Sequence, residues 1–256
     1  MLAALRAQAP GRTDENKTSM RPDPSAPPAA AATPSPALTW LRRALTAVLA
    51  ASTLISLGSQ AWDRSRMTLA AQRLGPHAVA AVKILQPMLA EGAGQDETAL
   101  LAEVNEFFNR RIVFTDDATA WGQNDYWASP LETLEKGQGD CEDYAIAKYF
   151  SLLAAGVPVA RLRLVYVRAS IGGPGGVSQA HMVLAWYAQP LAEPLILDNL
   201  IGEVRPASKR PDLTPVFSFN SEGLWQGTGS TSAGDPVSRL SRWREVIAKA
   251  RAEGFQ

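Results

Sequence analysis

Cysteine and histidine are the scarcest of the chemically reactive residue types in this chain. A single cysteine in 256 residues excludes an internal disulfide framework and any zinc site built from several cysteines. The only two histidines are His77 and His181, which argues against a histidine-rich metal site. An active site that pairs a cysteine with a histidine therefore has very few residues to draw on.

The chain also lacks a net charge. Its 25 lysines and arginines balance 25 aspartates and glutamates, for a formal net charge of +0. A balanced chain has no electrostatic reason to bind nucleic acid, so nucleic acid is not an expected partner. Hydrophobic residues make up 46% of the chain and charged residues 20%, which is typical of a globular protein.

The N-terminal quarter has a composition of its own. Residues 1–39 are rich in Ala, Pro, Ser and Thr and cannot bury enough apolar surface to fold, so we expect a disordered extension. This composition leaves Met20 open as the start of translation. In residues 40–61, two arginines precede the uncharged run Ala44–Leu57, and small residues follow it. This pattern predicts a secretory signal cleaved after Ala61.

The alternative for residues 40–61 is a retained N-terminal anchor, although the apolar run is short for crossing a bilayer. With either outcome we expect residues 62–256 to be exported as one folded domain. Membrane contact is expected only through that anchor.

Cys141 lies in the stretch Gly137–Leu153, GQGDCEDYAIAKYFSLL, around which the rest of the chain is organised. Apolar residues after the cysteine predict a helix that ends at Gly156, with Asp140 as its N-cap. The positive end of a helix favours a thiolate and makes the sulfur a nucleophile. The alternative is a small buried side chain at a helix start.

Three carboxylates surround this cysteine, those of Asp140, Glu142 and Asp143. Like charges disfavour a thiolate, so a nucleophilic Cys141 needs a cation beside it. That cation would be a histidinium or a metal ion that binds the carboxylates.

The remaining pattern places helices before strands. Helices are expected at 67–91, bounded or broken by two prolines, and at 97–110, and a short strand at 112–114. After the cysteine helix come strands at 161–168, 179–187 and 195–197, then a loop at 206–235 and a helix at 237–251. This order predicts an α+β fold in which a helical N-terminal part packs on an antiparallel sheet.

The loop after Trp121 allows two interpretations. Aromatic and amide residues alternate after Trp121, where they either cover the core or wall a cleft. In that loop, Gln123 or Asn124 could donate a hydrogen bond to an oxyanion. His77 has no local cysteine or carboxylate, so we interpret it as structural or solvent-facing.

Three residues could form one catalytic group. His181 lies in one predicted strand and Asp198 at the end of the next, and neighbouring strands place such pairs about 5 Å apart. A helix packed on that sheet could bring Cys141 to the other ring nitrogen, which gives a nucleophile, a base and an orienting acid. The alternative is a strand histidine whose hydrogen bonds go to the backbone.

Several strings resemble a known family, namely GDCEDYAIAKYFSL, LRLVYV, QAHMVLAWY and LDNL. They are similar to the bacterial transglutaminase-like cysteine proteinases, and the likeness extends to WGQNDYWASPLETL and RPASKRPDLTPVFSFN. The resemblance implies a papain/transglutaminase-like core with Cys141 as nucleophile, His181 as base and Asp198 as third member.

The resemblance also implies calcium dependence, with Asp140 and Glu142 as ligands and Asp143 as a further one. Calcium prefers hard oxygen ligands and would cancel the repulsion around the cysteine. Without the resemblance, these carboxylates would be interpreted as a helix cap and solvated surface charges.

The function implied is that of a periplasmic cysteine endopeptidase that cleaves the N-terminal region of a large surface adhesin and promotes biofilm dispersal. The implied inhibitor is the periplasmic domain of an inner-membrane receptor for cyclic di-GMP. Two alternatives stay open, a transglutaminase-type acyl transferase and a non-catalytic binding module of the same fold.

Overall fold

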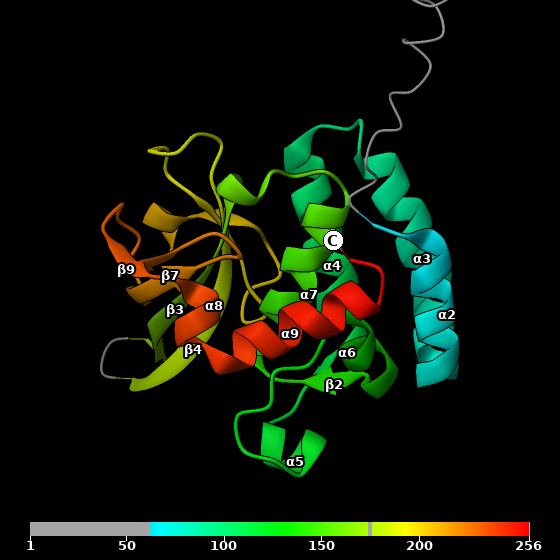
Figure 1. The fold of residues 1–256 in the computed structure, drawn as a ribbon. Coiled ribbons are helices and arrows are strands. Elements are labelled where there is room, and N and C mark those ends of the chain that lie inside the picture. The colour runs from blue at the N-terminus through cyan, green and yellow to red at the C-terminus, as the bar shows by residue number, and fades with distance from the viewer. Residues whose placement is uncertain (1–61, 174–175, 256) are drawn as a thin grey trace, which may run out of the picture. The chain divides into compact units, whose positions relative to one another are not determined.

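Residues 62–173 and 176–255 are described by the structure, a computed structural model (Figure 1). The predicted disordered extension and the predicted signal or anchor, residues 1–61, lie outside these ranges. None of the helices in the described ranges is long and apolar enough to cross a membrane.

Helices make up most of the first half of the described chain. They are α2 (Arg64–Leu74), α3 (Pro76–Gly92), α4 (Glu97–Arg111), α5 (Asp117–Trp121), α6 (Pro130–Lys136) and α7 (Cys141–Ala154), with α8 (Pro236–Arg239) and α9 (Ser241–Ala252) near the C-terminus. Two short 3₁₀ turns occur at Val159–Arg161 and Ala207–Lys209.

Strands form one antiparallel sheet in the order β6-β5-β4-β3-β7-β8-β9. They are β3 (Leu162–Ile171), β4 (Val177–Trp186), β5 (Leu195–Leu197), β6 (Arg205–Pro206), β7 (Leu213–Phe219), β8 (Leu224–Gln226) and β9 (Ser232–Gly234). A separate parallel pair joins β1 (Val113–Phe114) to β2 (Gln138–Gly139). The predicted α+β class is confirmed.

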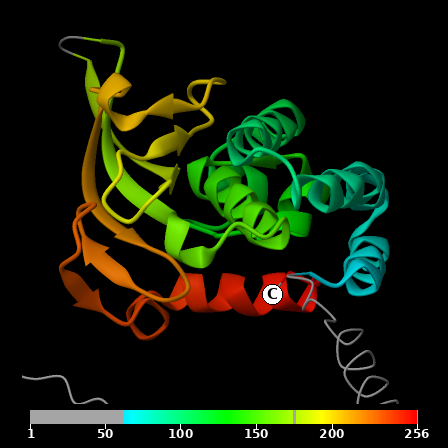
Figure 2. The same ribbon diagram turned by 90° about the horizontal axis from the view of Figure 1, so that it is seen from above.

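Helix α7 is the centre of the fold. It contacts β3 and β4 on one side and α3, α4 and α6 on the other, and its side chains are buried around nearly the whole helix. A helix that is apolar around its circumference belongs inside a core. Figures 1 and 2 show the sheet on one side of α7 and helices α2 and α3 on the opposite side.

The two faces of the sheet have separate cores. The face toward α7 contributes to the main core, in which the Trp243 ring of α9 packs edge-on against Tyr149 and at a tilt against Phe150. The outer face carries a smaller buried cluster, made up of Val165, Val167, Val183, Ala185, Tyr187 and Ile196. Alternation along β3 and β4 places these residues opposite the main core.

The ends of the described chain meet. Trp62 and Phe255 form an antiparallel bridge, and the amide of Asp63 donates a 2.7 Å hydrogen bond to the carbonyl of Gly254. Both Trp62 and Phe255 are buried.

Two segments that contain proline tested the predictions. The predicted break in the helix at 67–91 is confirmed at Pro76, which begins α3, where its missing amide costs nothing. Pro87 lies inside α3 without ending it. The loop predicted at 206–235 was wrong, since it holds β7, β8 and β9. Pro215 lies within β7 where the register with β3 shifts, and a proline in a strand argues locally against a strand.

Candidate functional site

The single cysteine begins α7, as predicted. The pair β1–β2 leads directly into it, and the amide of Thr115 donates a 2.9 Å bond to the carbonyl of Gly139. Asp140 caps the helix by accepting a 3.2 Å bond from the amide of Glu142. A side chain at Gly139 would come within 2.5 Å of the Asp143 carboxylate, so the turn before the cysteine requires glycine.

The Cys141 thiol donates a 2.7 Å hydrogen bond to Oε2 of Glu142. Burial raises its pKa, and the charges of Glu142 and Asp140 raise it further, while the Met182 amide lowers it. The predicted conflict between the helix start and its carboxylates is therefore present. Unless a cation offsets these charges, the sulfur is held as the thiol.

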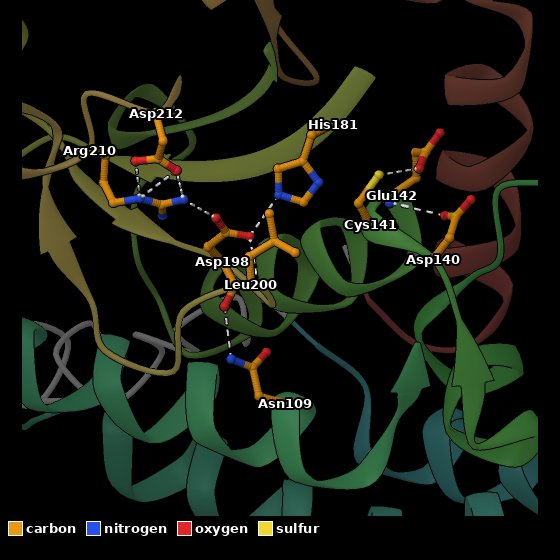
Figure 3. Close-up of polar contacts among 9 residues, drawn as sticks. All are labelled: Asn109, Asp140, Cys141, Glu142, His181, Asp198, Leu200, Arg210 and Asp212. Atoms are coloured by element: carbon orange, nitrogen blue, oxygen red, sulfur yellow. Dashed lines mark hydrogen bonds and ion pairs between the residues drawn. The ribbon is translucent and has the colours of Figure 1, made fainter. Parts of the chain in front are cut away.

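His181 and Asp198 form a buried pair on adjacent strands. Nε2 of His181 lies 2.8 Å from Oδ1 of Asp198, and the two residues are 3% and 1% exposed. His181 lies in β4, and Asp198 directly follows β5, which pairs with β4. In Figure 3 the other ring nitrogen of His181 faces the sulfur of Cys141. The structure thus brings the three predicted residues to one place.

Asp198 is fixed by residues that the sequence did not indicate. Its Oδ2 accepts a 2.7 Å bond from Nη2 of Arg210, and its Oδ1 also accepts from the amide of Leu200. Burial raises the pKa of Asp198, but the hydrogen bonds from His181, Leu200 and Arg210 outweigh it and lower the pKa to about 2. The acid is therefore ionised at neutral pH.

The backbone of Asp198 is held as well. Nδ2 of Asn109 donates a 2.8 Å bond to its carbonyl (Figure 3). Nδ2 of Asn105 donates to the carbonyl of Gly202, in the loop after β5. Both asparagines lie on α4, one turn apart. In the sequence, nothing distinguishes these two asparagines from other polar residues of a helix.

Carboxylates gather on the other side of the cysteine. Oxygens of Asp117, Asp140 and Asp143 all lie within 4.8 Å of one another, and a second group joins Asp140 and Glu142 to the thiol. Asp140 belongs to both groups, whereas the predicted ligands Glu142 and Asp143 belong to one each. The group with Asp143 adds Asp117, which begins α5. No local sequence motif indicated Asp117, because it lies far from Cys141 in the sequence and comes close to it only in the folded chain.

These carboxylates have raised pKa values. Burial and the charge of Asp140 raise the pKa of Asp117 to about 6 and that of Asp143 to about 7. Burial and Glu142 raise the pKa of Asp140 to about 8. Oδ1 of Asp117 is buried and has no hydrogen-bond partner among the described residues. Converging hard oxygens with uncompensated charge are the donor set that a calcium ion prefers.

Asp143 also organises the aromatic loop. Its Oδ1 accepts a 2.8 Å bond from the amide of Ala128, and its Oδ2 accepts from Nε1 of Trp121. The ligand role predicted for Asp143 therefore has to coexist with two hydrogen bonds to that loop.

A groove of about 410 Å³ lies beside the cysteine and is lined by Asp140 and Glu142. Its other lining residues include Trp127, Tyr166 and Phe217, and the Tyr166 and Phe217 rings stack at 5.0 Å. Of the two open interpretations of the aromatic loop, a wall of a cleft fits better than a cover over the core.

The proposed oxyanion donors differ in position. Asn124 lines the groove, whereas Gln123 is exposed and not part of its lining. Between them and Trp127, Asp125 adopts φ 56°, the one positive φ of a non-glycine residue in the described ranges. Such strain is typical of loops at functional sites. His77 lies exposed on α3, with Nδ1 3.2 Å from the carbonyl of Glu135, as the structural interpretation predicts.

The chain is similar to one known protein family and to solved structures. The family model described as bacterial transglutaminase-like cysteine proteinase matches residues 77–213. Solved structures of LapG from Legionella pneumophila are also similar. The EGTA-treated form is 37% identical with a TM-score of 0.64, over 73% of this chain and 97% of that one. The calcium-bound form is 36% identical with a TM-score of 0.62, over 73% and 98%. The comparison with curated proteins gives no match.

Proposed function

Because this chain belongs to the bacterial transglutaminase-like cysteine proteinases, we propose that it cleaves protein substrates with Cys141, His181 and Asp198 as its catalytic triad. Membership of this family identifies the chain as a cysteine peptidase.

One observation is the main support for the proposed triad. A buried imidazole is bonded through Nε2 to the Asp198 carboxylate, while its other nitrogen faces the sulfur of Cys141 (Figure 3). An ionised acid at Nε2 fixes the ring tautomer and leaves Nδ1 free to exchange a proton with the thiol.

The reaction then follows from the positions of the groups. His181 takes the proton of the Cys141 thiol, and the sulfur attacks a peptide carbonyl bound in the groove. The oxyanion lies near the Cys141 amide at the start of α7, and Asn124 is the proposed second donor. His181 gives its proton to the leaving amine, and water hydrolyses the thioester with His181 as base.

We further propose that the chain binds calcium at the carboxylates beside the nucleophile. Asp117, Asp140 and Asp143 would supply converging oxygens, with Glu142 adjoining them. A calcium ion held there would supply positive charge, which would offset the part of the raised pKa of Cys141 that comes from Glu142 and Asp140, although not the part that comes from burial. The similar LapG structure with bound calcium supports this assignment.

The proposed setting is the periplasm, which the export segment predicted at residues 40–61 supports. The proposed substrate is the N-terminal region of a large surface adhesin, whose release promotes biofilm dispersal. The proposed inhibitor is the periplasmic domain of an inner-membrane receptor for cyclic di-GMP. The likeness to LapG supports these three proposals.

The proposed protease function is tested by comparing the cleavage rates of variants at the two histidines. Purified residues 62–256 are incubated with an adhesin N-terminal fragment, with calcium or with a chelator. We expect cleavage with calcium, a loss of about 1,000-fold or more in Cys141→Ala and His181→Ala, and normal cleavage in His77→Ala, which alters the exposed histidine.

Two results would contradict the proposal. Adhesin release by Cys141→Ala at the normal rate would point to a non-catalytic binding module. Cross-linking of the fragment to an added primary amine, without chain cleavage, would point to acyl transfer instead of proteolysis.

A further inference from the structure

The hairpin of α2 and α3, at the start of the described chain, carries charge of one sign. Residues 64–90 contain four basic residues and no aspartate or glutamate, although the two signs balance over the whole chain. The four are Arg64, Arg66, Arg73 and Lys83, and all of them are exposed. The hairpin therefore has a positive surface on a protein that has no net charge.

The carboxylates around the hairpin offset only part of this charge. Asp63 caps α2, and its Oδ2 lies 3.8 Å from Nε of Arg66. Glu135 is half-buried at the turn of the hairpin, where it accepts a 2.7 Å bond from the amide of Ala78. Glu91, in the last turn of α3, lines a groove between α3 and α4. These contacts leave the arginines of α2 largely facing solvent.

The solvent side of α2 combines arginines with an exposed leucine. Arg66, Leu69 and Arg73 follow at intervals of three and four residues, which places them on one face of the helix. Leu69 is 56% exposed. Arg251, exposed at the end of α9, adjoins this face, since its carbonyl accepts a 3.4 Å bond from Nη1 of Arg66. Cationic side chains around an exposed apolar one are typical of helices that lie on a membrane surface.

The place of the hairpin in the chain favours the same partner. The export segment predicted at residues 40–61 ends directly before Trp62, and the Asp63 cap leads from there into α2. The hairpin is thus the part of the fold that follows the predicted segment most closely. If that segment is retained as an anchor, it holds the hairpin near the lipid headgroups, where anionic lipids attract lysine and arginine.

We propose that the hairpin of α2 and α3 binds the headgroups of anionic phospholipids, so that α2 rests on the membrane surface with Leu69 turned toward it. This contact adds to the anchor predicted at residues 40–61 and does not require it. The proposal also does not depend on the proposed protease function.

This orientation leaves the groove beside Cys141 open to substrate. In Figures 1 and 2 the hairpin lies on the side of α7 away from the sheet, which supplies Tyr166 and Phe217 to that groove. The described residues that line the groove include five carboxylates and no lysine or arginine. Nothing in the groove attracts an anionic surface, so the positive hairpin determines which side meets the membrane.

Binding is tested by co-sedimentation of residues 62–256 with vesicles of equal parts phosphatidylcholine and phosphatidylglycerol, in one calcium-containing buffer. We expect saturable binding to these vesicles and none to phosphatidylcholine alone. The double variant Arg66→Gln and Arg73→Gln should bind about 25-fold more weakly, because each basic residue near an anionic surface contributes about fivefold. Glutamine is a good helix former, so circular dichroism should show an unchanged helix content.

The matched control is the double variant Arg110→Gln and Arg205→Gln. It removes the same net charge from α4 and β6, where the two side chains are 76% and 43% exposed. This control should bind the vesicles like the parent. High salt should release the parent from the vesicles, because it screens exposed charges.

A polarity-sensitive dye reports on the orientation. Cys141→Ala removes the single cysteine, so the dye can be attached to Leu69→Cys on α2 or to Val216→Cys on β7. These two side chains are 56% and 42% exposed in the parent. With anionic vesicles, only the dye on α2 should shift its emission to shorter wavelength.

Several results would overturn the inference. Absence of binding, or equal binding to neutral vesicles, would remove the role of anionic lipid. Equal losses in the hairpin variant and its control would point to net charge instead of the hairpin. An equal response of the dye at both positions would contradict the orientation, and tighter binding of a short DNA duplex would point to nucleic acid. Cleavage is not measured in any of these experiments, so failure of the proposed protease function would leave their outcome unchanged.

Discussion

Asn109 of α4 donates a 2.8 Å hydrogen bond to the backbone carbonyl of Asp198, so a helix from the first half of the chain holds the acid of the proposed triad. The loop that follows β5 carries that acid, and loops need such anchors to keep a side chain in place. Asn105 anchors the same loop at Gly202, four residues further on.

The two asparagines form a matched pair of variants. Asn109→Ala and Asn105→Ala should each lower the free energy of unfolding by about 1–2 kcal/mol, because each leaves a carbonyl without its donor. Only Asn109→Ala releases the residue that orients His181, so it should lower kcat by about tenfold, with Asn105→Ala near normal. Equal losses of kcat in both variants would show that stability alone is responsible.

Arg210 should control the acid stability of the fold. The pKa of folded Asp198 is about 2, below its ordinary 3.8, so its contribution of about 2 kcal/mol is complete above pH 4 and disappears as the pH falls toward 2. Arg210→Gln removes a buried partner of that carboxylate. We expect a loss of about 3 kcal/mol at neutral pH and an acid-unfolding midpoint at higher pH.

The control for Arg210→Gln is Arg205→Gln, which removes an exposed ion pair with Glu203. Exposed pairs contribute little, so circular dichroism should give a nearly unchanged acid-unfolding curve for this control. An unchanged acid midpoint in Arg210→Gln itself would contradict the role assigned to the guanidinium.

Asp117 should contribute to the proposed calcium site although it is distant from the cysteine in sequence. Asp117→Asn keeps the shape and removes the charge, so we expect calcium affinity to fall by about tenfold or more in a calorimetric titration. The calcium-dependent rise in Tm should shrink accordingly.

The neighbouring Asp116 gives the matched control for Asp117. It caps α5 through its bonds to Thr119 and belongs to neither carboxylate group. Asparagine is an equally good cap, so Asp116→Asn should bind calcium normally. If both variants bind calcium like the parent, Asp117 is not a ligand.

Glu253 should make the fold less stable as the pH rises. Burial raises its pKa to about 7, against an ordinary 4.5, while the amide of Leu131 and the hydroxyl of Ser129 donate to it. A raised folded pKa means that the folded state binds the proton more tightly than the unfolded state. Stability should therefore decline by about 3 kcal/mol between pH 4.5 and pH 7.

Glu253→Gln cannot ionise, so urea unfolding at several pH values should show a flatter profile over that range. Glu245→Gln alters an exposed residue on α9, the helix that ends directly before Glu253, and should keep the slope of the parent. A parent protein whose stability does not change between pH 4.5 and pH 7 would exclude this role for Glu253.

The sequence predicted what short-range rules determine. The helix that begins at Cys141 and its Asp140 cap follow from residues a few positions apart, and β3, β4 and β5 pair with strands that are consecutive in the chain. Their relative placement supported the expectation that the three candidate residues meet.

The residues that were missed depend on long-range contacts. Asp117 and Arg210 reach the site across loops whose paths no local pattern specifies. The strand β7 was also missed, because Pro215 hides the alternation of its neighbours and its partner is β3, far back in the chain. Local propensity cannot signal a strand whose stability comes from such a distant edge.

The bridge between Trp62 and Phe255 has a practical meaning for protein engineering. Since Trp62 and Phe255 are adjacent, a short peptide could join the two ends, and the chain could be reopened after the exposed Gly172, which directly follows β3. Such a circular permutant would keep the helices, the sheet and the groove while moving any fusion partner to the end of β3.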